Sequence, residues 1–144
     1  MTTLISIDPG KASGVAQFED RVLKRVFLLD NLPVSFFADT LVIEIPQVYP
    51  VRAWKGDPND LIEVARIAGY WEGLIAACTR VLDVVHVRPH DWKGNRPKEI
   101  DNAYTLSKLT DAERAVIDGA QIPKSKLHNA IDAVGIGLWY LNRR

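Results

Sequence analysis

Three acidic residues interrupt otherwise apolar segments, and two of them end predicted strands. Asp8 follows the apolar run 4–7, and Glu44 follows 41–43. An unpaired buried carboxylate is costly, and in an open α/β sheet ligands bind beyond the carboxyl ends of parallel strands. If the two strands are neighbours, the acids stay ionised only beside a compensating cation. Because all-oxygen carboxylate ligands favour Mg²⁺ or Mn²⁺ over zinc, such a pair indicates a magnesium-like site.

The third acid, Asp132, lies in a predicted helix near the end of the chain. His128 and Asn129 stand four and three residues earlier on the same side of that helix. This face would present a carboxylate and an imidazole together. Gly135 and Gly137 each cost about 1 kcal/mol in a helix relative to Ala, so close packing against the sheet is their better explanation. A helix pressed there would carry Asp132 toward the strand ends.

Each of these residues also has a purely structural interpretation. Asp8 could cap the turn at 9–10, and Glu44 could form a salt bridge at a strand end. Asp132 could be solvated near a helix start, and His128 could be an ordinary surface or core histidine. The residues alone leave these alternatives open.

The elements that must position the acids follow from hydrophobic periodicity. Branched and apolar runs predict strands at 4–7, 14–18, 22–29, 41–45 and 81–87. A turn at Glu19 and Asp20 predicts a hairpin between the second and third strands. The run of branched apolar residues at 41–45, which only Glu44 interrupts, is typical of a strand covered on both faces, as in a parallel sheet.

The apolar period changes to nearly four residues over 57–79, which predicts the first long helix. Weaker helical patterns follow at 98–109 and 111–119, and a final helix at about 125–141 has Ser125 as its expected cap. The segment 31–40 has room for two or three helical turns at most. A hairpin followed by helix-linked strands predicts an α/β fold with a mixed sheet and helices on its faces.

Composition limits the class of protein. The 144 residues, 47% of them hydrophobic, suffice for one domain over 1–144 with its own core. Eighteen basic residues balance eighteen acidic ones, so any anion-binding surface must be local. The longest uncharged stretch has ten residues, against roughly 20 for a membrane span, and no leader pattern is found. We therefore expect a cytoplasmic protein without a membrane partner; the single Cys78 makes no internal disulfide.

Three motifs carry a resemblance to a known family. Residues 5–10 followed by 13–16 resemble the opening of RuvC-type Holliday junction resolvases, within the ribonuclease H-like group. Residues 41–44 resemble that family's second acidic strand, and residues 128–133 its acidic C-terminal helix. The similarity covers nearly the whole chain in matching order, and short phage-encoded relatives are the most similar.

This resemblance implies a ribonuclease H-like fold with a five-stranded mixed sheet of order 3-2-1-4-5 and helices on both faces. It implies a homodimer that cuts symmetric strands of a four-way DNA junction with two Mg²⁺ ions, for which Mn²⁺ can substitute, and no small-molecule cofactor. By the same resemblance, Asp8, Glu44 and Asp132 are catalytic metal ligands. His128 is the expected fourth ligand, with Asn129 as the alternative. Asp8 would bridge the ions, Glu44 would complete one site, and Asp132 with His128 would complete the other.

The basic residues predict where DNA binds. Residues 88–98 resemble the basic loop after the family's fifth strand, and two further patches follow Glu44 and flank the last helix. The expected DNA contacts are Arg52, Trp54, Lys55, Arg88, Lys93, Arg96, Lys98, Lys124 and Lys126. Solvated loops are the alternative. Relatives place an aromatic residue near the crossover, and by resemblance Tyr49 would be that residue. Pro46 displaces Tyr49 from the expected position, which puts this role in doubt.

Other functions explain less of the sequence. Gly10 and Lys11 lack the remaining residues of a phosphate-binding loop, and an actin-like ATPase needs two such domains. A ribonuclease H-like nuclease for RNA or other branched DNA remains an alternative, as does a non-catalytic nucleic-acid-binding module. Tyr70 and Trp71, with nearby small residues, fit either the core or a two-fold interface.

Overall fold

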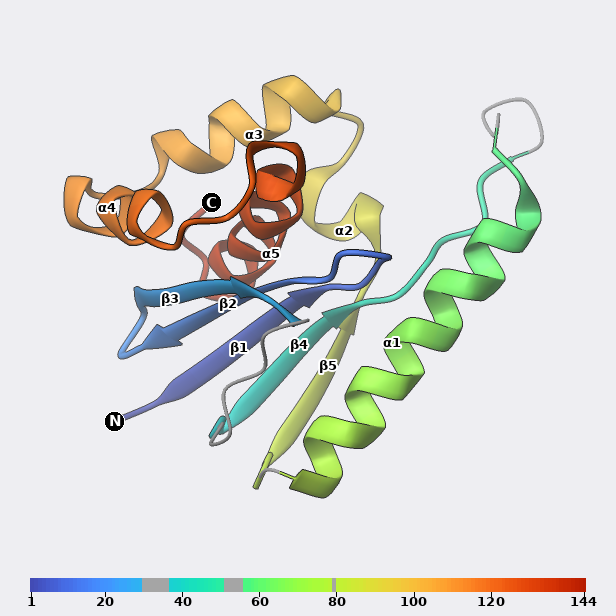
Figure 1. Ribbon diagram of the computed structural model, residues 1–144, viewed down its shortest axis with the longest axis horizontal. Coiled ribbons are helices and arrows are strands. Elements are labelled where there is room, and N and C mark those ends of the chain that lie inside the picture. The colour runs from blue at the N-terminus through green and yellow to red at the C-terminus, as the bar shows by residue number, and fades with distance from the viewer. Residues whose placement is uncertain (30–36, 51–55, 79) are drawn as a thin grey trace.

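The computed structural model describes residues 1–29, 37–50, 56–78 and 80–144, and a five-stranded sheet forms its centre (Figure 1). The strands are β1 (Thr3–Asp8), β2 (Gly14–Glu19), β3 (Val22–Leu28), β4 (Thr40–Glu44) and β5 (Asp83–Val87). Their order is β3-β2-β1-β4-β5. β1 and β3 run antiparallel to β2, whereas β1, β4 and β5 are parallel. The predicted mixed sheet, its hairpin and its strand order are confirmed.

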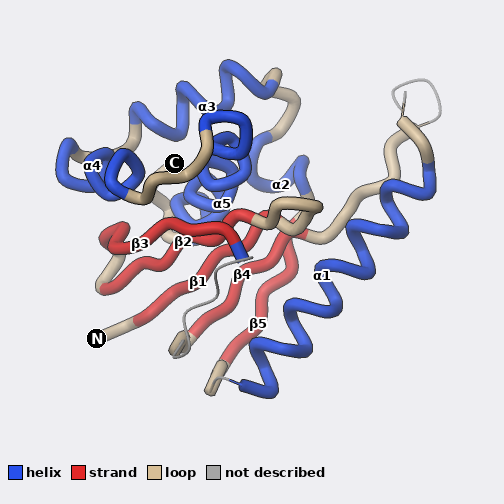
Figure 2. Tube along the Cα trace, in the orientation of Figure 1, coloured by secondary structure: helices blue, strands red, loops and turns tan. Residues whose placement is uncertain are grey.

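Helices cover both faces of this sheet, as predicted (Figure 2). They are α1 (Pro58–Cys78), α2 (Pro89–Lys93), α3 (Lys98–Ser107), α4 (Asp111–Gly119) and α5 (Leu127–Tyr140), with a 3₁₀ turn η2 (Lys124–Lys126) before the last. α1 lies on one side of the sheet and the other four lie on the opposite side. In the described part of the chain, no helix is long and apolar enough to cross a membrane.

Alternation along the strands divides the core between the two faces. Toward α5, the buried strand residues are Leu4, Ala16, Phe18, Leu23, Val26, Val42 and Val87. Toward α1, they are Ile5, Ile7, Val15, Leu41 and Ile43, which cluster with Ala68 and Ile75 of that helix. Asp8 continues the series of Leu4, and Glu44 continues that of Val42. Both acids therefore belong to the α5 side of the sheet.

Two glycines let α5 lie directly on the sheet. A Cβ on Gly14 of β2 would stand 2.1 Å from the carbonyl oxygen of Asn129. A Cβ on Gly137 of α5 would stand 2.2 Å from Cε2 of Phe18. Neither position has room for a side chain, because backbone or buried ring atoms occupy the space. The predicted packing of Gly137 against the sheet is confirmed.

Gly135 packs differently from its prediction. A Cβ at this position would stand 2.7 Å from ring atom Cζ3 of Trp92 and 3.0 Å from Oγ1 of Thr105. Gly135 therefore packs on α2 and α3 instead of on the sheet. The face of α5 that Gly135 occupies is covered by these two helices, which is why a second glycine is needed there.

The last helix begins later than the sequence pattern predicts. Residues 124–126 form a separate 3₁₀ turn, closed by the Lys126 amide donating to the Pro123 carbonyl at 2.8 Å. Lys126 therefore occupies the cap position of α5, without a side-chain cap, and the prediction of Ser125 as the cap is wrong. The fifth strand likewise begins two residues later than the predicted 81.

The predicted basic loop at 88–98 contains the short helix α2. Pro89 stands at its first position, where a proline loses no hydrogen bond and its fixed φ suits a helix. In the sequence, this proline indicates only the end of a strand. The predicted segment 31–40 falls largely outside the described residues.

A buried carboxylate joins α4 to the hairpin. Glu113 is 1% exposed and accepts from Arg143 through Nη1 at 2.7 Å and Nη2 at 2.9 Å. It also accepts from the backbone amides of Leu23 at 2.9 Å and Thr110 at 3.0 Å. These donors, those of Arg143 above all, lower the pKa of Glu113 to about 2.

Candidate active site

Asp8 and Glu44 end two adjacent parallel strands. Ile7 is paired with Ile43 in the register of β1 and β4, and each acid is the next residue of its strand. Side chains alternate between the two sides of a strand, and each acid directly follows a residue of the same register pair, so both acids point to the same side of the sheet. The parallel register thus places the two acids at neighbouring strand ends, which meets the condition that the sequence left open.

α5 brings the third acid to the same place. Ser6 Oγ on β1 donates to the carbonyl oxygen of Ala133 at 2.7 Å, which ties the helix to the strand one residue after Asp132. Asp132 is only 7% exposed. Its negative charge raises the pKa of both Asp8 and Glu44, so all three lie within electrostatic reach of one another. We refer to Asp8, Glu44 and Asp132 as the acidic edge.

Burial and mutual repulsion make the acidic edge reluctant to ionise. Burial is the largest cause that raises the pKa of each acid, and the pKa of Asp8 is raised well above its usual range. Lys93 opposes the rise for all three, and Lys98 for Asp8 and Asp132. Among the described residues, none of the three carboxylates takes part in an ion pair. Negative charge at this edge is therefore only partly compensated.

Trp92 is a site residue that sequence reasoning missed. Its indole Nε1 donates to Oε2 of Glu44 at 2.5 Å, and this hydrogen bond lowers the pKa of that carboxyl. The ring is 3% exposed, with the Arg144 guanidinium 4.7 Å from its centroid on a face. A buried indole N–H requires an acceptor, but the sequence does not show which one. The indole holds one oxygen of Glu44 in a defined position.

A buried ion pair stands behind Trp92. Asp101 is 1% exposed and receives Arg96 Nε at 3.1 Å and Arg144 Nη2. Arg96 also lies over the ring of Tyr104, 4.4 Å from its centroid. Arg96, predicted to contact DNA, is thus already engaged within the protein.

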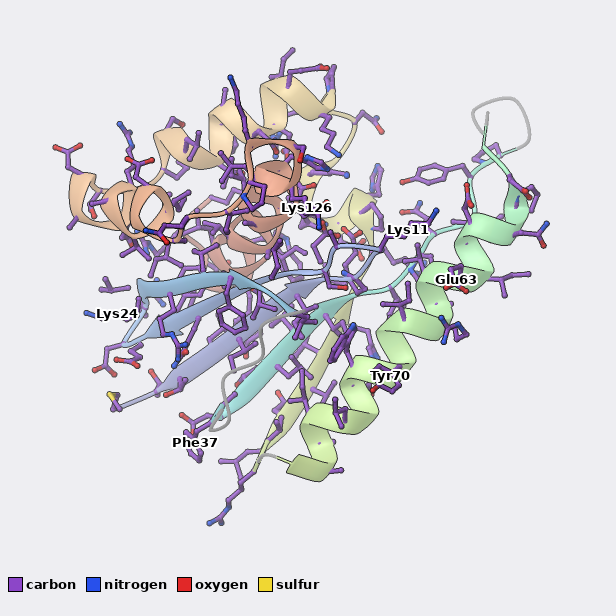
Figure 3. The ribbon with its side chains drawn as sticks, viewed as in Figure 1. Lys11, Lys24, Phe37, Glu63, Tyr70 and Lys126 are labelled. Atoms are coloured by element: carbon purple, nitrogen blue, oxygen red, sulfur yellow. The ribbon has the colours of Figure 1, made fainter. Side chains whose placement is uncertain are left out.

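The other predicted residues occupy several places around the acidic edge. His128 is partly exposed in the first turn of α5 and lowers the pKa of Asp132, so these two are brought together. Tyr49 is partly exposed. The predicted DNA contacts that are exposed are Arg88, Lys98, Lys124 and Lys126, the last of which is labelled in Figure 3. Those that lie outside the described residues are Arg52, Trp54 and Lys55.

The carboxylate oxygens of the acidic edge are the type of ligand that a hard divalent cation binds, although they are not gathered around one point. Over the described ranges, no group of three or more His, Cys, Asp and Glu side chains is arranged so that it could hold a metal ion. The acidic edge nevertheless offers oxygen ligands without an ion-pair partner in the described part of the chain, and such ligands suit Mg²⁺ or Mn²⁺. A cation would also supply the charge compensation that these residues leave incomplete.

Comparison with known proteins identifies the fold. No protein-family model matches the chain, and a search of the curated proteins finds no match. The chain is similar to T. thermophilus RuvC solved in complex with a Holliday junction substrate, with 15% identity and a TM-score of 0.51, over 99% of this chain and 96% of that chain. A further structure of Thermus thermophilus RuvC matches at 14% identity and a TM-score of 0.45, over 97% of this chain and 93% of that one. The first similarity shows that the chain has a RuvC-like, ribonuclease H-like fold.

Proposed function

We propose that this protein is a metal-dependent endonuclease that cuts four-way DNA junctions by phosphodiester hydrolysis. The observation that carries the proposal is the acidic edge. Three largely buried carboxylates lie near the carboxyl ends of β1 and β4 on a RuvC-like sheet, and no described cation forms an ion pair with them. Carboxylates that destabilise a fold and face a ligand-binding edge are the pattern expected of a catalytic site.

In this proposal Asp8, Glu44 and Asp132 hold two Mg²⁺ ions, with His128 as fourth ligand, Asn129 as its alternative, and Mn²⁺ as a substitute metal. Bound ions supply the positive charge that stabilises the attacking and leaving oxygens. Trp92 donates to Oε2 of Glu44 and would thereby hold this carboxylate in a defined orientation as a ligand.

The proposed DNA-binding surface consists of basic residues around the acidic edge. Lys93 and Lys98 lower the pKa of Asp8 and Asp132, and in this proposal the two lysines contact phosphates next to the cut. Exposed Arg88, Lys124 and Lys126 extend this basic surface along the starts of α2 and α5. Because the net charge is zero, binding depends on this local surface.

We further propose that two copies pair through the outer face of α1, since symmetric cutting of a junction requires a two-fold arrangement. Ile62 is exposed there, next to the exposed glycines at 69 and 73. Trp71 instead packs against the core beneath α1. Only the exposed residues are therefore available to a second copy.

The test is cleavage of a synthetic four-way junction with Mg²⁺, with Mn²⁺ and with EDTA, alongside duplex DNA and an RNA:DNA hybrid. We expect paired nicks at symmetric positions of the junction, which depend on the metal. Preferential cutting of the hybrid would favour the ribonuclease alternative. Junction binding without cutting under either metal would identify a non-catalytic binding module.

A further inference from the structure

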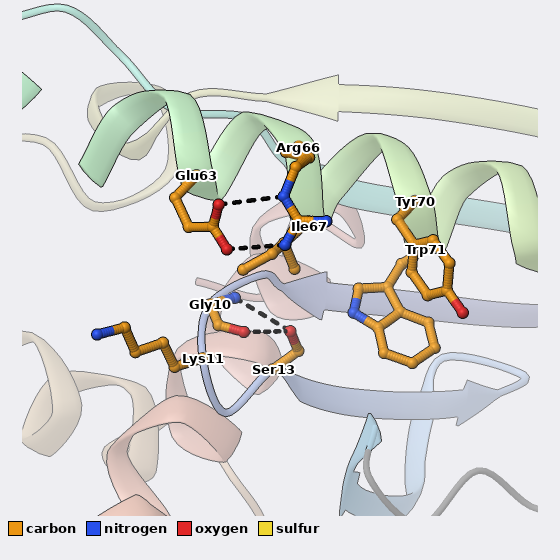
Figure 4. A pocket seen from close by; sticks show the side chains of 8 residues that line it. All are labelled: Gly10, Lys11, Ser13, Glu63, Arg66, Ile67, Tyr70 and Trp71. Atoms are coloured by element: carbon orange, nitrogen blue, oxygen red, sulfur yellow. Dashed lines mark hydrogen bonds and ion pairs between the residues drawn. The ribbon is translucent and has the colours of Figure 1, made fainter. Parts of the chain in front are cut away.

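A pocket separate from the acidic edge opens on the α1 side of the sheet, next to the turn that follows Asp8 (Figure 4). Its volume is about 370 Å³. The β1–β2 turn and α1 form its walls, and the side chains that matter here are Lys11, Ser13, Glu63, Arg66, Tyr70 and Trp71. None of these residues belongs to the acidic edge.

One end of the pocket is polar and carries net positive charge. Arg66 donates to Glu63 through Nε at 3.1 Å and Nη2 at 2.8 Å, which leaves its other N–H groups for a further acceptor. Lys11 is exposed and close enough to lower the pKa of Glu63, after the larger effect of Arg66. Two cations face one carboxylate, so this end can accept an anion.

The turn between β1 and β2 is held in a defined shape. Ser13 Oγ donates to the Gly10 carbonyl at 2.9 Å and accepts from the Gly10 amide at 3.0 Å. Lys11 projects from the turn between these two residues. The turn therefore presents its cation from a fixed backbone, directly after the strand that ends in Asp8.

The other end of the pocket is aromatic. Tyr70 is 58% exposed and contacts Trp71 edge to face, with the ring centroids 5.1 Å apart at 72°. Trp71 supports the tyrosine from the core side. Figure 4 shows the two rings at one end of the pocket, and Lys11 with the Glu63–Arg66 pair toward the other.

We propose that this pocket binds one unpaired nucleotide of a DNA strand, with the base against Tyr70 and the phosphate at Lys11 and Arg66. A cationic end and an exposed ring separated along one pocket match the two parts of a nucleotide. Aromatic stacking combined with basic residues is how proteins hold single-stranded DNA. The inference deepens the proposed function and rests on it, because the turn that bounds the pocket directly follows the strand that ends in Asp8.

Binding of fluorescent (dT)₈ in EDTA tests the pocket without any cleavage. Tyr70→Ala should weaken (dT)₈ binding at least about 5-fold, since stacking on one base contributes roughly that factor or more. Lys11→Ala should reduce the log–log salt slope by about 0.7, the value for one phosphate contact in a single strand. Both side chains are exposed, so neither change disturbs the core.

Matched controls come from exposed residues away from the pocket. Phe37→Ala removes an aromatic ring that is 53% exposed, and Lys24→Ala removes a lysine on β3; Figure 3 labels both. Neither should change (dT)₈ affinity or its salt slope. Tyr70→Ala should also leave the affinity for plain duplex DNA unchanged, because paired bases do not enter the pocket.

The outcomes separate this inference from the proposed function. If the wild-type protein binds (dT)₈ and Tyr70→Ala leaves this affinity unchanged, the nucleotide-binding role of the pocket is refuted, even if junctions are cut. The same conclusion follows if Phe37→Ala weakens binding as much as Tyr70→Ala does. Selective loss in Tyr70→Ala supports the pocket even if no junction is cut. Absence of (dT)₈ binding by the wild-type protein also overturns it.

Discussion

The carboxylate of Glu113 and those of the acidic edge lie in two regions that treat buried negative charge in opposite ways. At Glu113, the Arg143 fork and two backbone amides satisfy the carboxylate and lower its pKa to about 2. At the acidic edge, burial and repulsion raise the pKa of all three acids, and no described ion pair offsets this. The same fold thus gives Glu113 an arginine partner but gives the three acids of the acidic edge no such partner among its described residues. The difference distinguishes a structural carboxylate from candidate catalytic ones.

The largest expected effect follows from Asp8→Asn. Loss of this carboxylate should lower the junction cleavage rate at least about 1,000-fold, because bound metal contributes several kcal/mol of transition-state stabilisation. Removing one of three repelling acids should leave the urea midpoint unchanged or higher. Gel-shift binding in EDTA should persist. Nicking at the wild-type rate would refute the assigned role of the acidic edge.

Glu113→Gln should act on stability instead. Breaking the buried pair with Arg143 should lower the free energy of unfolding by about 2–4 kcal/mol, measured by urea denaturation. Asp118→Asn is the matched control, since Asp118 is exposed on the same helix. Equal destabilisation by the two substitutions would contradict the distinction drawn between a paired carboxylate and a solvated one.

The pH dependence of stability should have opposite signs in the two regions. Folding lowers the pKa of Glu113 from 4.5 to about 2, so its contribution of about 3 kcal/mol is full above pH 4.5 and is lost as pH falls toward 2. Folding raises the pKa of Asp8 above 3.8, so its destabilising effect appears as pH rises above 3.8. Urea unfolding of wild type, Glu113→Gln and Asp8→Asn across pH measures both. Parallel curves of unfolding free energy against pH for the three proteins would contradict the opposite signs expected for Glu113 and Asp8.

Trp92→Phe should separate orientation of Glu44 from packing. An aromatic ring is kept and the N–H donor is removed, so we expect a 10- to 100-fold weaker apparent Mg²⁺ affinity or lower activity, roughly the usual size for a group that orients a metal ligand. A metal titration of junction cleavage measures this. Trp139→Phe, a change of the same kind on α5, should have no such effect. An unchanged Mg²⁺ titration would show that the indole serves packing alone.

The smallest effect concerns the lysines beside the acids. Lys93→Ala combined with Lys98→Ala should reduce the log–log salt slope of duplex-arm binding by about 1.8, or 0.9 for each phosphate that the protein no longer neutralises. Lys24→Ala is the control, since Lys24 is exposed on β3. A slope unaltered by the double substitution would mean that these lysines serve the acids and not the DNA.

Local sequence signals are sufficient to predict most elements and insufficient to predict their partners. The hairpin agrees with prediction because strand periodicity and turn signals act over short distances. The strand order also agrees with prediction, but it was implied by the resemblance to RuvC-type resolvases and not by local signals. The helix at 89–93 and the 3₁₀ turn before α5 were not predicted, because such short elements have almost no periodic signal in the sequence. Residues 88–98 therefore read in the sequence only as a basic loop.

By itself, the sequence determined which acids end apolar segments and which faces of strands and helices are apolar, because these properties are set by neighbouring residues. Only the tertiary structure decided that Trp92 meets Glu44 across 48 positions and that Arg143 meets Glu113 across 30. It also decided the approach of α5, through Ser6 and Ala133, 127 positions apart. Such pairings depend on the packing of whole helices against the sheet, and residue type alone does not specify which acceptor a buried donor reaches.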